Sequence, residues 1–235
     1  MEAYIIKGYR TAVGKAKKGG FKNYRSDDMA VELIKHLVKN VPELDPTTVN
    51  DVIVGCANPE GEQGLQVGRL ISARALGIEV PGITINRYCA SGLEAISMAV
   101  AKVKAGMGDI YIAGGAESMS LIPMTGYKLA PSYQANKENI NYHVSMGATA
   151  EAVAAKFNIN REAADEFSLA SHQKAANAID QGYFKGEILP IEVEEVFVKE
   201  GKKVTSTHTV AVDEGVRRDT SMAGLSRLRA AFKQG

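Results

Sequence analysis

Cys89 has the surroundings in which proteins build reactive thiols. An apolar, strand-like run over residues 82–85 precedes it, and the apolar positions that follow recur at helical spacing: Leu93, Ile96, Val100 and Val103. Ser91 and Glu94 fit an S-x-x-E capping box, which predicts Ser91 as the helix N-cap. The partial positive charge of a helix N-terminus favours thiolate over thiol. The sequence therefore predicts an accessible, nucleophilic cysteine between a strand and a helix.

The alternative interpretation is that such a cysteine is simply a small packed side chain. For the chain's second cysteine, Cys56, which follows an apolar run at residues 52–55, we favour this interpretation. The four histidines lie in polar or helix-face settings, for which solvated or hydrogen-bonded side chains are expected: His36, His143, His172 and His208.

The first half of the chain alternates strand and helix signals. Strands are predicted at residues 3–7, 51–55, 82–85 and 109–113, and helices at a segment capped by Ser26 and at residues 65–76 and 91–105. This alternation indicates an α/β fold with a mainly parallel sheet covered by helices on both faces. Ligands bind such sheets at the carboxyl ends of the strands, and Cys89 follows one of these ends.

The pattern changes after about residue 120. Residues 121–142 read as a surface loop, followed by helices at 146–157 and from Asn160 to about Gly182. A hairpin is predicted at 188–198 and 203–206 and a short helix at 220–232. The positive charges near the chain's end form either a solvated face or a site for phosphate groups: Arg217, Arg218, Arg227 and Arg229.

Composition removes several classes of function. The chain has 235 residues, 45% of them hydrophobic, and 28 Lys and Arg residues balance 27 Asp and Glu residues. With charges so balanced, the whole chain has no excess positive charge that would attract nucleic acid or an anionic membrane. Neither a secretory signal nor a membrane-spanning run is present, and two cysteines are too few for a disulfide framework. We expect a cytoplasmic protein with no metal and no covalently bound cofactor.

Five stretches in chain order carry a family resemblance. The run from Asn86 to Ile96 (NRYCASGLEAI) resembles the nucleophile motif of the thiolases, and residues 114–120, 146–151, 171–175 and 213–218 resemble further thiolase segments. The resemblance implies a thiolase-like α/β fold, with a mainly parallel sheet flanked by helices and an inserted loop domain. It implies an N-terminal α/β domain at residues 1–119, incomplete because it lacks its last strand, and a loop domain at 120–235 that contributes to coenzyme A binding.

The resemblance also implies chemistry. Cys89 would take an acyl group as a thioester during thiolytic cleavage of 3-ketoacyl-CoA by coenzyme A, in fatty-acid β-oxidation. Coenzyme A and acyl-CoA are then substrates. By position in the family motifs, Met146 would flank the pantetheine and acyl tunnel and Arg217 would lie near the nucleotide. Ala231 and Phe232 would line the path of adenine and pantetheine.

Other thiolase segments are absent from this sequence. They are an Asn-Glu-Ala-Phe-like segment, a Gly-His-Pro segment with the activating histidine, and a Cys-x-Gly-Gly-Gly segment with an acid/base cysteine. We therefore expect that the second half of the family fold is absent and that this chain alone is inactive. The partners implied are acyl-CoA substrates, further copies of the intact protein in a homodimer or homotetramer, and a separate C-terminal thiolase half if the enzyme is split.

Three alternatives stay open: a biosynthetic acetoacetyl-CoA thiolase (acetyl-CoA C-acetyltransferase), a decarboxylating 3-ketoacyl synthase, and a non-catalytic or split-thiolase assembly module. Biosynthetic thiolases usually have histidine before the Met-Gly pair, where this chain has Ser145. Residues 115–119 (GAESM) also resemble degradative thiolases more closely. We therefore favour the degradative reaction.

Overall fold

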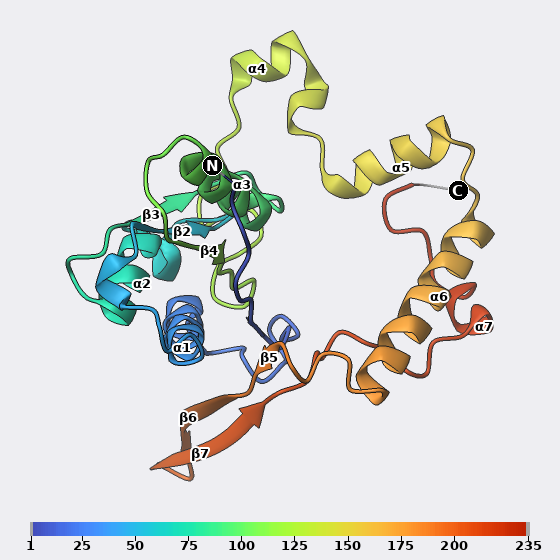
Figure 1. Cartoon of the computed structure of the whole chain (residues 1–235). Helices are drawn as coiled ribbons and strands as arrows, with labels where there is room; N and C mark the ends of the chain where they lie inside the picture. Colours follow the sequence, from blue (N-terminus) through green and yellow to red (C-terminus); the bar gives the residue numbers. More distant parts are fainter. Residues whose placement is uncertain (1, 234–235) are drawn as a thin grey trace. The chain divides into compact units, whose positions relative to one another are not determined.

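The computed structural model describes residues 2–233 of the chain (Figure 1). Within these residues the chain forms two compact units. The first consists of residues 2–128 and 186–215, and the second of residues 129–185 and 216–233. The boundary expected near residue 120 concerns the domains of the intact protein and stays a prediction.

A three-stranded parallel sheet forms the centre of the first unit. Its strands are β2 (Asp51–Gly55), β3 (Gly82–Ile85) and β4 (Tyr111–Gly115), in the order β3-β2-β4. At the carboxyl end of β2, Gly55 is in register with Ile85 of β3 and with Gly115 of β4. The predicted parallel sheet is therefore confirmed. The carboxyl ends of its three strands lie side by side, and we call this end the carboxyl edge of the sheet.

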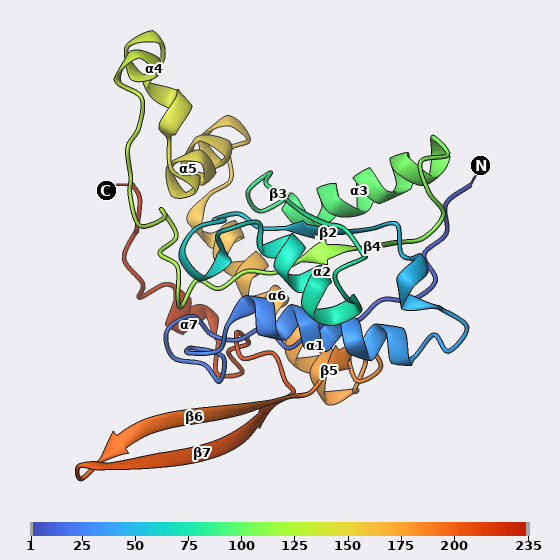
Figure 2. The ribbon, with the colours of Figure 1, turned by 90° about the vertical axis from the view of Figure 1, so that its left-hand side faces the viewer.

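Helices cover both faces of this sheet (Figure 2). Helices α1 (Ser26–Lys39) and α2 (Val67–Leu76) pack on the face formed by Val52 and Val54 of β2. On the opposite face Ile53 packs against α3 (Ser91–Lys104). Because β2 is buried on both faces, it reads in sequence as a continuous apolar run instead of an alternating one.

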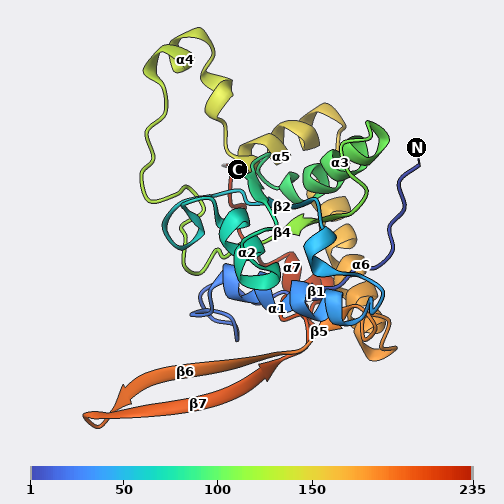
Figure 3. The ribbon, with the colours of Figure 1, turned by 60° about the vertical axis from the view of Figure 1, so that its left-hand side comes forward.

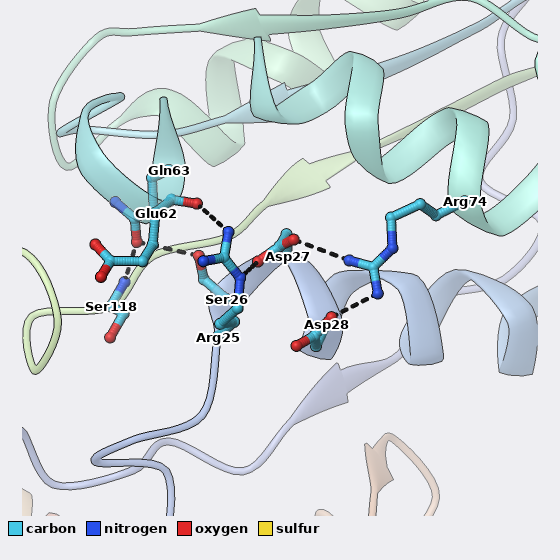
Figure 4. Close-up of polar contacts among 8 residues, drawn as sticks. All are labelled: Arg25, Ser26, Asp27, Asp28, Glu62, Gln63, Arg74 and Ser118. Carbon is cyan, nitrogen blue, oxygen red and sulfur yellow. Dashed lines mark hydrogen bonds and ion pairs between the residues drawn. The ribbon is translucent and has the colours of Figure 1, made fainter. Parts of the chain in front are cut away.

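Polar contacts hold the start of α1 in place (Figure 4). The Ser26 hydroxyl donates to Oε1 of Gln63, at 3.1 Å, in the 3-10 helix Gly61–Gln63, which is labelled η2. Asp27, which is 2% exposed, accepts from Arg25 and from Arg74 of α2, each at 2.8 Å. The expectation that Ser26 caps this helix was wrong, because Ser26 is its first residue and the N-cap position is Arg25.

The second part of the first unit contains a long hairpin (Figure 3). Strand β1 (Arg10–Thr11) pairs in parallel with β5 (Ile188–Leu189), and β6 (Ile191–Lys199) pairs with β7 (Lys202–Val210) in antiparallel fashion. The buried side chains at the base of the hairpin pack together with residues near the N-terminus: Ala12, Phe21, Ile191, Val193 and Val210. The predicted hairpin is confirmed, with a longer second strand.

The predicted strand at residues 3–7 is wrong. The described residues before Arg10 form no strand, and the Tyr4, Ile5 and Ile6 side chains are 74 to 81% exposed. An apolar run becomes a strand only where a partner strand takes up its backbone hydrogen bonds, and no described strand does so here. Hydrophobicity alone therefore misled the prediction.

The second unit is helical. It contains α4 (Tyr133–Glu138), the 3-10 helix Ile140–His143, α5 (Met146–Lys156), α6 (Arg161–Asp180) and α7 (Met222–Leu225). Asn160 caps α6 by accepting from the Ala163 N–H at 2.9 Å. Two details differ from the prediction: α4 lies in the predicted loop, and α7 has four residues instead of the predicted 220–232. No helix among residues 2–233 is long and apolar enough to cross a membrane.

Candidate functional site

Cys89 is exposed at the carboxyl edge of the sheet, between β3 and α3. Gly55 lets the start of α3 approach this edge closely, and Gly115 lies beside it in contact with the helix. A Cβ atom added to Gly55, the last residue of β2, would overlap the backbone of Ser91. At Gly115, the last residue of β4, an added Cβ would lie 3.5 Å from the Gly92 Cα. The sheet thus fixes the position of the N-terminus of α3, which begins two residues after Cys89.

The turn before Cys89 has an unusual backbone conformation. Tyr88 adopts φ of 47°, in the left-handed region that costs a residue with a Cβ atom roughly 1–2 kcal/mol. The Ser91 hydroxyl donates to the Tyr88 carbonyl at 2.6 Å and accepts from the Arg87 N–H at 2.8 Å. A non-glycine residue persists in this region only where its surroundings impose it.

The predicted capping box is therefore wrong. Ser91 is the first residue of α3, the N-cap position is Ala90, and no side chain caps the helix there. The Glu94 carboxylate pairs with the Arg87 guanidinium at 3.0 Å instead of reaching back to the helix N-terminus. The Ser91 hydroxyl bonds to the turn that carries Cys89. Its role is therefore to fix the backbone around the cysteine and not to cap the N-terminus of α3.

A hydrogen-bond network connects this turn to the ends of β2 and β4. Asn86 accepts from the Tyr88 N–H at 2.7 Å and donates to the Ala57 carbonyl at 2.9 Å. The Ala57 N–H donates to the Glu117 carboxylate at 2.5 Å, and Gln63 donates to the same carboxylate at 2.6 Å. Sequence reasoning missed the roles of Asn86 and Glu117. Both lie inside the recognised motifs, but only the fold shows that they join three segments.

Cys56 contrasts with Cys89. Its side chain is 1% exposed and packs in the core, and its sulfur accepts from Gln63 Nε2 at 3.4 Å. Burial, together with the negative charge of Glu117, raises the pKa of the Cys56 thiol to about 12. The interpretation of Cys56 as a packed side chain is confirmed, and a neutral, enclosed thiol cannot act as a nucleophile near neutral pH.

The four histidines also have local partners, as expected. His36 contacts Asn40 and the Tyr9 ring, and His208 Nε2 lies 3.1 Å from the Gly20 carbonyl. In the second unit, His143 pairs with Asn136 and His172 accepts from the Arg217 N–H. Among residues 2–233 no group of three or more His, Cys, Asp or Glu side chains is arranged to hold a metal ion.

The other predicted site residues lie in the second unit. Met146 is the first residue of α5 and is 70% exposed, and the Phe232 ring lies against Gly147, the next residue of that helix. The structure thus brings the Met146 and Phe232 segments together. Ala231 is exposed.

Arg217 lines a cavity of about 260 Å³ in this unit, together with His172 and Arg218. The Arg218 guanidinium forms two hydrogen bonds of 2.8 Å with the Asp180 carboxylate. These bonds lower the pKa of Asp180. Of the two neighbouring arginines, Arg218 is therefore committed to a structural ion pair, and Arg217 is the candidate for an anionic ligand.

Comparisons with known proteins agree with this geometry. The family model for the N-terminal domain of thiolase matches residues 3–235. The chain is 46% identical over 233 residues to a 3-ketoacyl-CoA thiolase of Bacillus subtilis, covering 98% of this chain and 59% of that protein. It is 36% identical over 236 residues to the peroxisomal 3-ketoacyl-CoA thiolase 1 of Arabidopsis thaliana, covering 99% and 52%.

Among solved structures, the chain resembles the crystal structure of the Bacillus anthracis acetyl-CoA acetyltransferase, with a TM-score of 0.77 and 29% identity. The match covers 96% of this chain and 58% of that one. The chain thus spans 59% or less of the length of each of these proteins.

Proposed function

Because this chain belongs to the thiolase family, we propose that Cys89 is its acyl-accepting nucleophile and that the intact protein cleaves 3-ketoacyl-CoA with coenzyme A. The observation that carries the proposal is the contrast between the two cysteines. Cys89 is exposed at the N-terminus of α3, whereas Cys56 is buried with a raised pKa. Backbone N–H groups at this end of the helix stabilise a developing oxyanion.

The proposed reaction has two stages. The Cys89 thiolate attacks the 3-keto carbon, the bond between C2 and C3 breaks, and acetyl-CoA leaves as a carbanion equivalent that takes up a proton. The thiol of a second coenzyme A then attacks the Cys89 thioester, which yields the shortened acyl-CoA and regenerates the cysteine thiol. The two proton transfers are removal of the Cys89 proton and protonation of the leaving carbanion. We assign neither to a described residue, because Cys56 is buried, His36 pairs with Asn40, and His208 pairs with the Gly20 carbonyl.

The degradative direction is favoured over acetyl transfer between two acetyl-CoA molecules. The curated relatives that are 36 to 46% identical are named 3-ketoacyl-CoA thiolases, whereas the acetyl-CoA acetyltransferase structure is 29% identical. Ser145, at the position where biosynthetic enzymes usually have histidine, accepts from the Ala148 N–H at 3.2 Å as the cap of α5. A role in fatty-acid β-oxidation follows from this direction.

We also propose how the remaining site residues serve coenzyme A. The 3′-phosphate and diphosphate suit the Arg217 guanidinium, since guanidinium groups bind phosphate in bidentate fashion. The pairing of the Phe232 ring with the start of α5 supports an apolar path for pantetheine beside Met146, with Ala231 next to it. Cytoplasmic location and assembly into homodimers or homotetramers complete the proposal for the intact protein.

Acyl transfer to Cys89 tests the proposal directly. The chain, whose mass of 25.1 kDa is first verified, is incubated with acetyl-CoA, and the cysteine-containing peptides are examined by mass spectrometry. A protein of full thiolase length that contains this chain is treated in the same way, because the chain alone lacks the segment with the activating histidine and is expected to be inactive. In that longer protein we expect one acetyl group on the Cys89 peptide, none after Cys89→Ser, and unchanged labelling after Cys56→Ser. Failure to acetylate Cys89 in the protein of full thiolase length would contradict the proposal. Labelling that requires a co-purified second polypeptide would favour the split-thiolase alternative.

A further inference from the structure

The Tyr88 backbone determines where the Cys89 thiol lies. Tyr88 has φ of 47° and immediately precedes the cysteine, so rotation about this one residue swings the Cys89 Cα and its side chain. Nothing in the Tyr88 side chain explains the conformation, because the ring is 75% exposed. An exposed aromatic residue without other constraints would relax to negative φ, since a side chain with a Cβ atom disfavours the left-handed region.

Hydrogen bonds hold the two peptide groups on either side of Tyr88. On the amino side, the Tyr88 N–H donates to Asn86 Oδ1 at 2.7 Å. On the carboxyl side, the Tyr88 carbonyl accepts from the Ser91 hydroxyl at 2.6 Å and from the Ser91 N–H at 3.0 Å. The carboxyl side is thus fixed by α3 itself. On the amino side, the Arg87 carbonyl accepts from the Ala90 N–H at 3.1 Å within the turn, whereas the Tyr88 N–H is held by the Asn86 side chain.

That side chain is anchored to the sheet. Asn86 Nδ2 donates to the Ala57 carbonyl at 2.9 Å, and the Ala57 N–H donates to Glu117 at 2.5 Å. Glu117 is held in turn by Gln63 at 2.6 Å. The Asn86 amide therefore connects the turn to segments that follow β2 and β4, and it uses its acceptor and its donor for different partners.

We propose that Asn86 is a positioning residue for Cys89: by holding the Tyr88 N–H, it keeps the left-handed backbone that aims the thiol along the N-terminus of α3. The inference rests on the proposed function, because it concerns the reactivity of the same cysteine. A displaced thiol loses its alignment with the acyl donor, and a misplacement of about 1 Å can slow a reaction roughly 100-fold.

Three substitutions separate this role from a general loss of structure. Asn86→Ala removes both hydrogen bonds. Asn86→Ser keeps an uncharged oxygen that can accept from the N–H two residues on, as in ST-turns. In the double variant Asn86→Ala with Tyr88→Gly, glycine enters the left-handed region without a steric penalty, and little packing is lost because Tyr88 is exposed.

In the protein of full thiolase length, the measured quantities are the rate at which acetyl-CoA acetylates Cys89 and the rate at which the small reagent iodoacetamide alkylates it. Both rates are followed by peptide mass spectrometry. Cys56, being buried, reports on the integrity of the fold in the same sample. We expect about a tenfold or larger loss of acetylation rate in Asn86→Ala, a smaller change in the alkylation rate because iodoacetamide needs no bound orientation, and no new labelling of Cys56. Partial recovery is expected in Asn86→Ser and in the double variant.

The outcomes are distinguishable. If the unaltered protein of full thiolase length is not acetylated at Cys89, the proposed function fails. If the unaltered protein is acetylated and the Asn86→Ala variant is acetylated equally fast, only the positioning role is overturned. If Asn86→Ala leads to labelling of Cys56, the fold of that variant is disturbed and Asn86→Ser is used instead. Slower acetylation of Cys89 in Asn86→Ser, with Cys56 unlabelled, supports the proposal. An unchanged acetylation rate of Cys89 in Asn86→Ser overturns it.

Discussion

The two cysteines show how surroundings decide what a thiol can do. Cys56 and Cys89 each follow a strand of the same sheet, yet one is enclosed in the core and the other is exposed. Both are free of disulfides. The side-chain type is identical, so the difference in expected chemistry comes from the surroundings. Cys56 is buried beside the Glu117 carboxylate, whereas Cys89 is exposed at the N-terminus of α3.

Cys56 makes the stability of the fold depend on alkaline pH. Its pKa is raised from 9.0 to about 12 in the folded state, so the folded chain holds this proton more tightly than the unfolded chain. The stabilisation is complete below pH 9 and is lost as the pH rises toward 12, by at most about 1.4 kcal/mol per pH unit. In Cys56→Ala, the free energy of unfolding, measured with urea from pH 8.5 to 11, should fall less steeply. If the free energy of unfolding fell equally steeply with pH in both proteins, Cys56 would not be the source of the pH dependence.

The residues of the site differ in how far the sequence could reveal them. Cys89 was predicted from its type and from the strand and helix patterns around it. The left-handed Tyr88 and the hydrogen bond from Asn86 to Ala57 were not, because Ala57 lies 29 positions away in sequence. Ser91 was assigned to the wrong partner, since a hydroxyl at a helix start can bond either to the helix or to the preceding turn.

At the scale of elements, the helices and strands of the central sheet layer were predictable, whereas α4, the length of α7 and the segment at residues 3–7 were not. The helix over Ser91–Lys104 buries Ala95 and Ala99 against Ile53, so its apolar spacing reflects a real contact. Residues 4–6 are equally apolar but remain exposed and unpaired among the described strands. Periodicity reports which side of an element is buried, whereas strand formation depends on a partner elsewhere in the chain.

The approach of α3 to β2 depends on Gly55. Because a Cβ at this position would meet the backbone of Ser91 and not a flexible side chain, Gly55→Ala must move the helix start or the strand. We expect a loss of about 1–3 kcal/mol of unfolding free energy and slower acetylation of Cys89. Gly114→Ala in β4 is the matched control, since a Cβ there has no neighbour within 4 Å among the described residues. Equal stability and equal labelling in the two variants would refute the steric argument.

At the scale of the whole molecule, the chain leaves the first unit after residue 128 and returns at residue 186. Salt bridges and backbone contacts join the returning segment to the N-terminal region. Arg10 donates to Asp213 at 2.8 and 3.0 Å and to Glu187 at 2.7 Å. Asp213 also accepts from the Val13 N–H, and Glu214 accepts from the backbone N–H groups of residues 15 and 20. The carboxylates of Asp213 and Glu214 thus hydrogen-bond to residues 10–20, about 200 positions earlier in the chain.

This junction predicts how the first unit responds to acid. The hydrogen bonds from Arg10 lower the pKa of Asp213, so its contribution to stability is present above the unfolded pKa of about 3.9 and is lost as the pH falls through the lower folded value. Asp213→Asn should therefore lose about 1–3 kcal/mol at pH 7, and the gap should narrow below about pH 4. Urea unfolding, followed by tyrosine fluorescence in this tryptophan-free chain, measures both. Asp219→Asn, at an exposed aspartate of the second unit, is the control and should change little. A gap that stays constant from pH 7 to pH 3 would show that Asp213 acts through its shape and not through its charge.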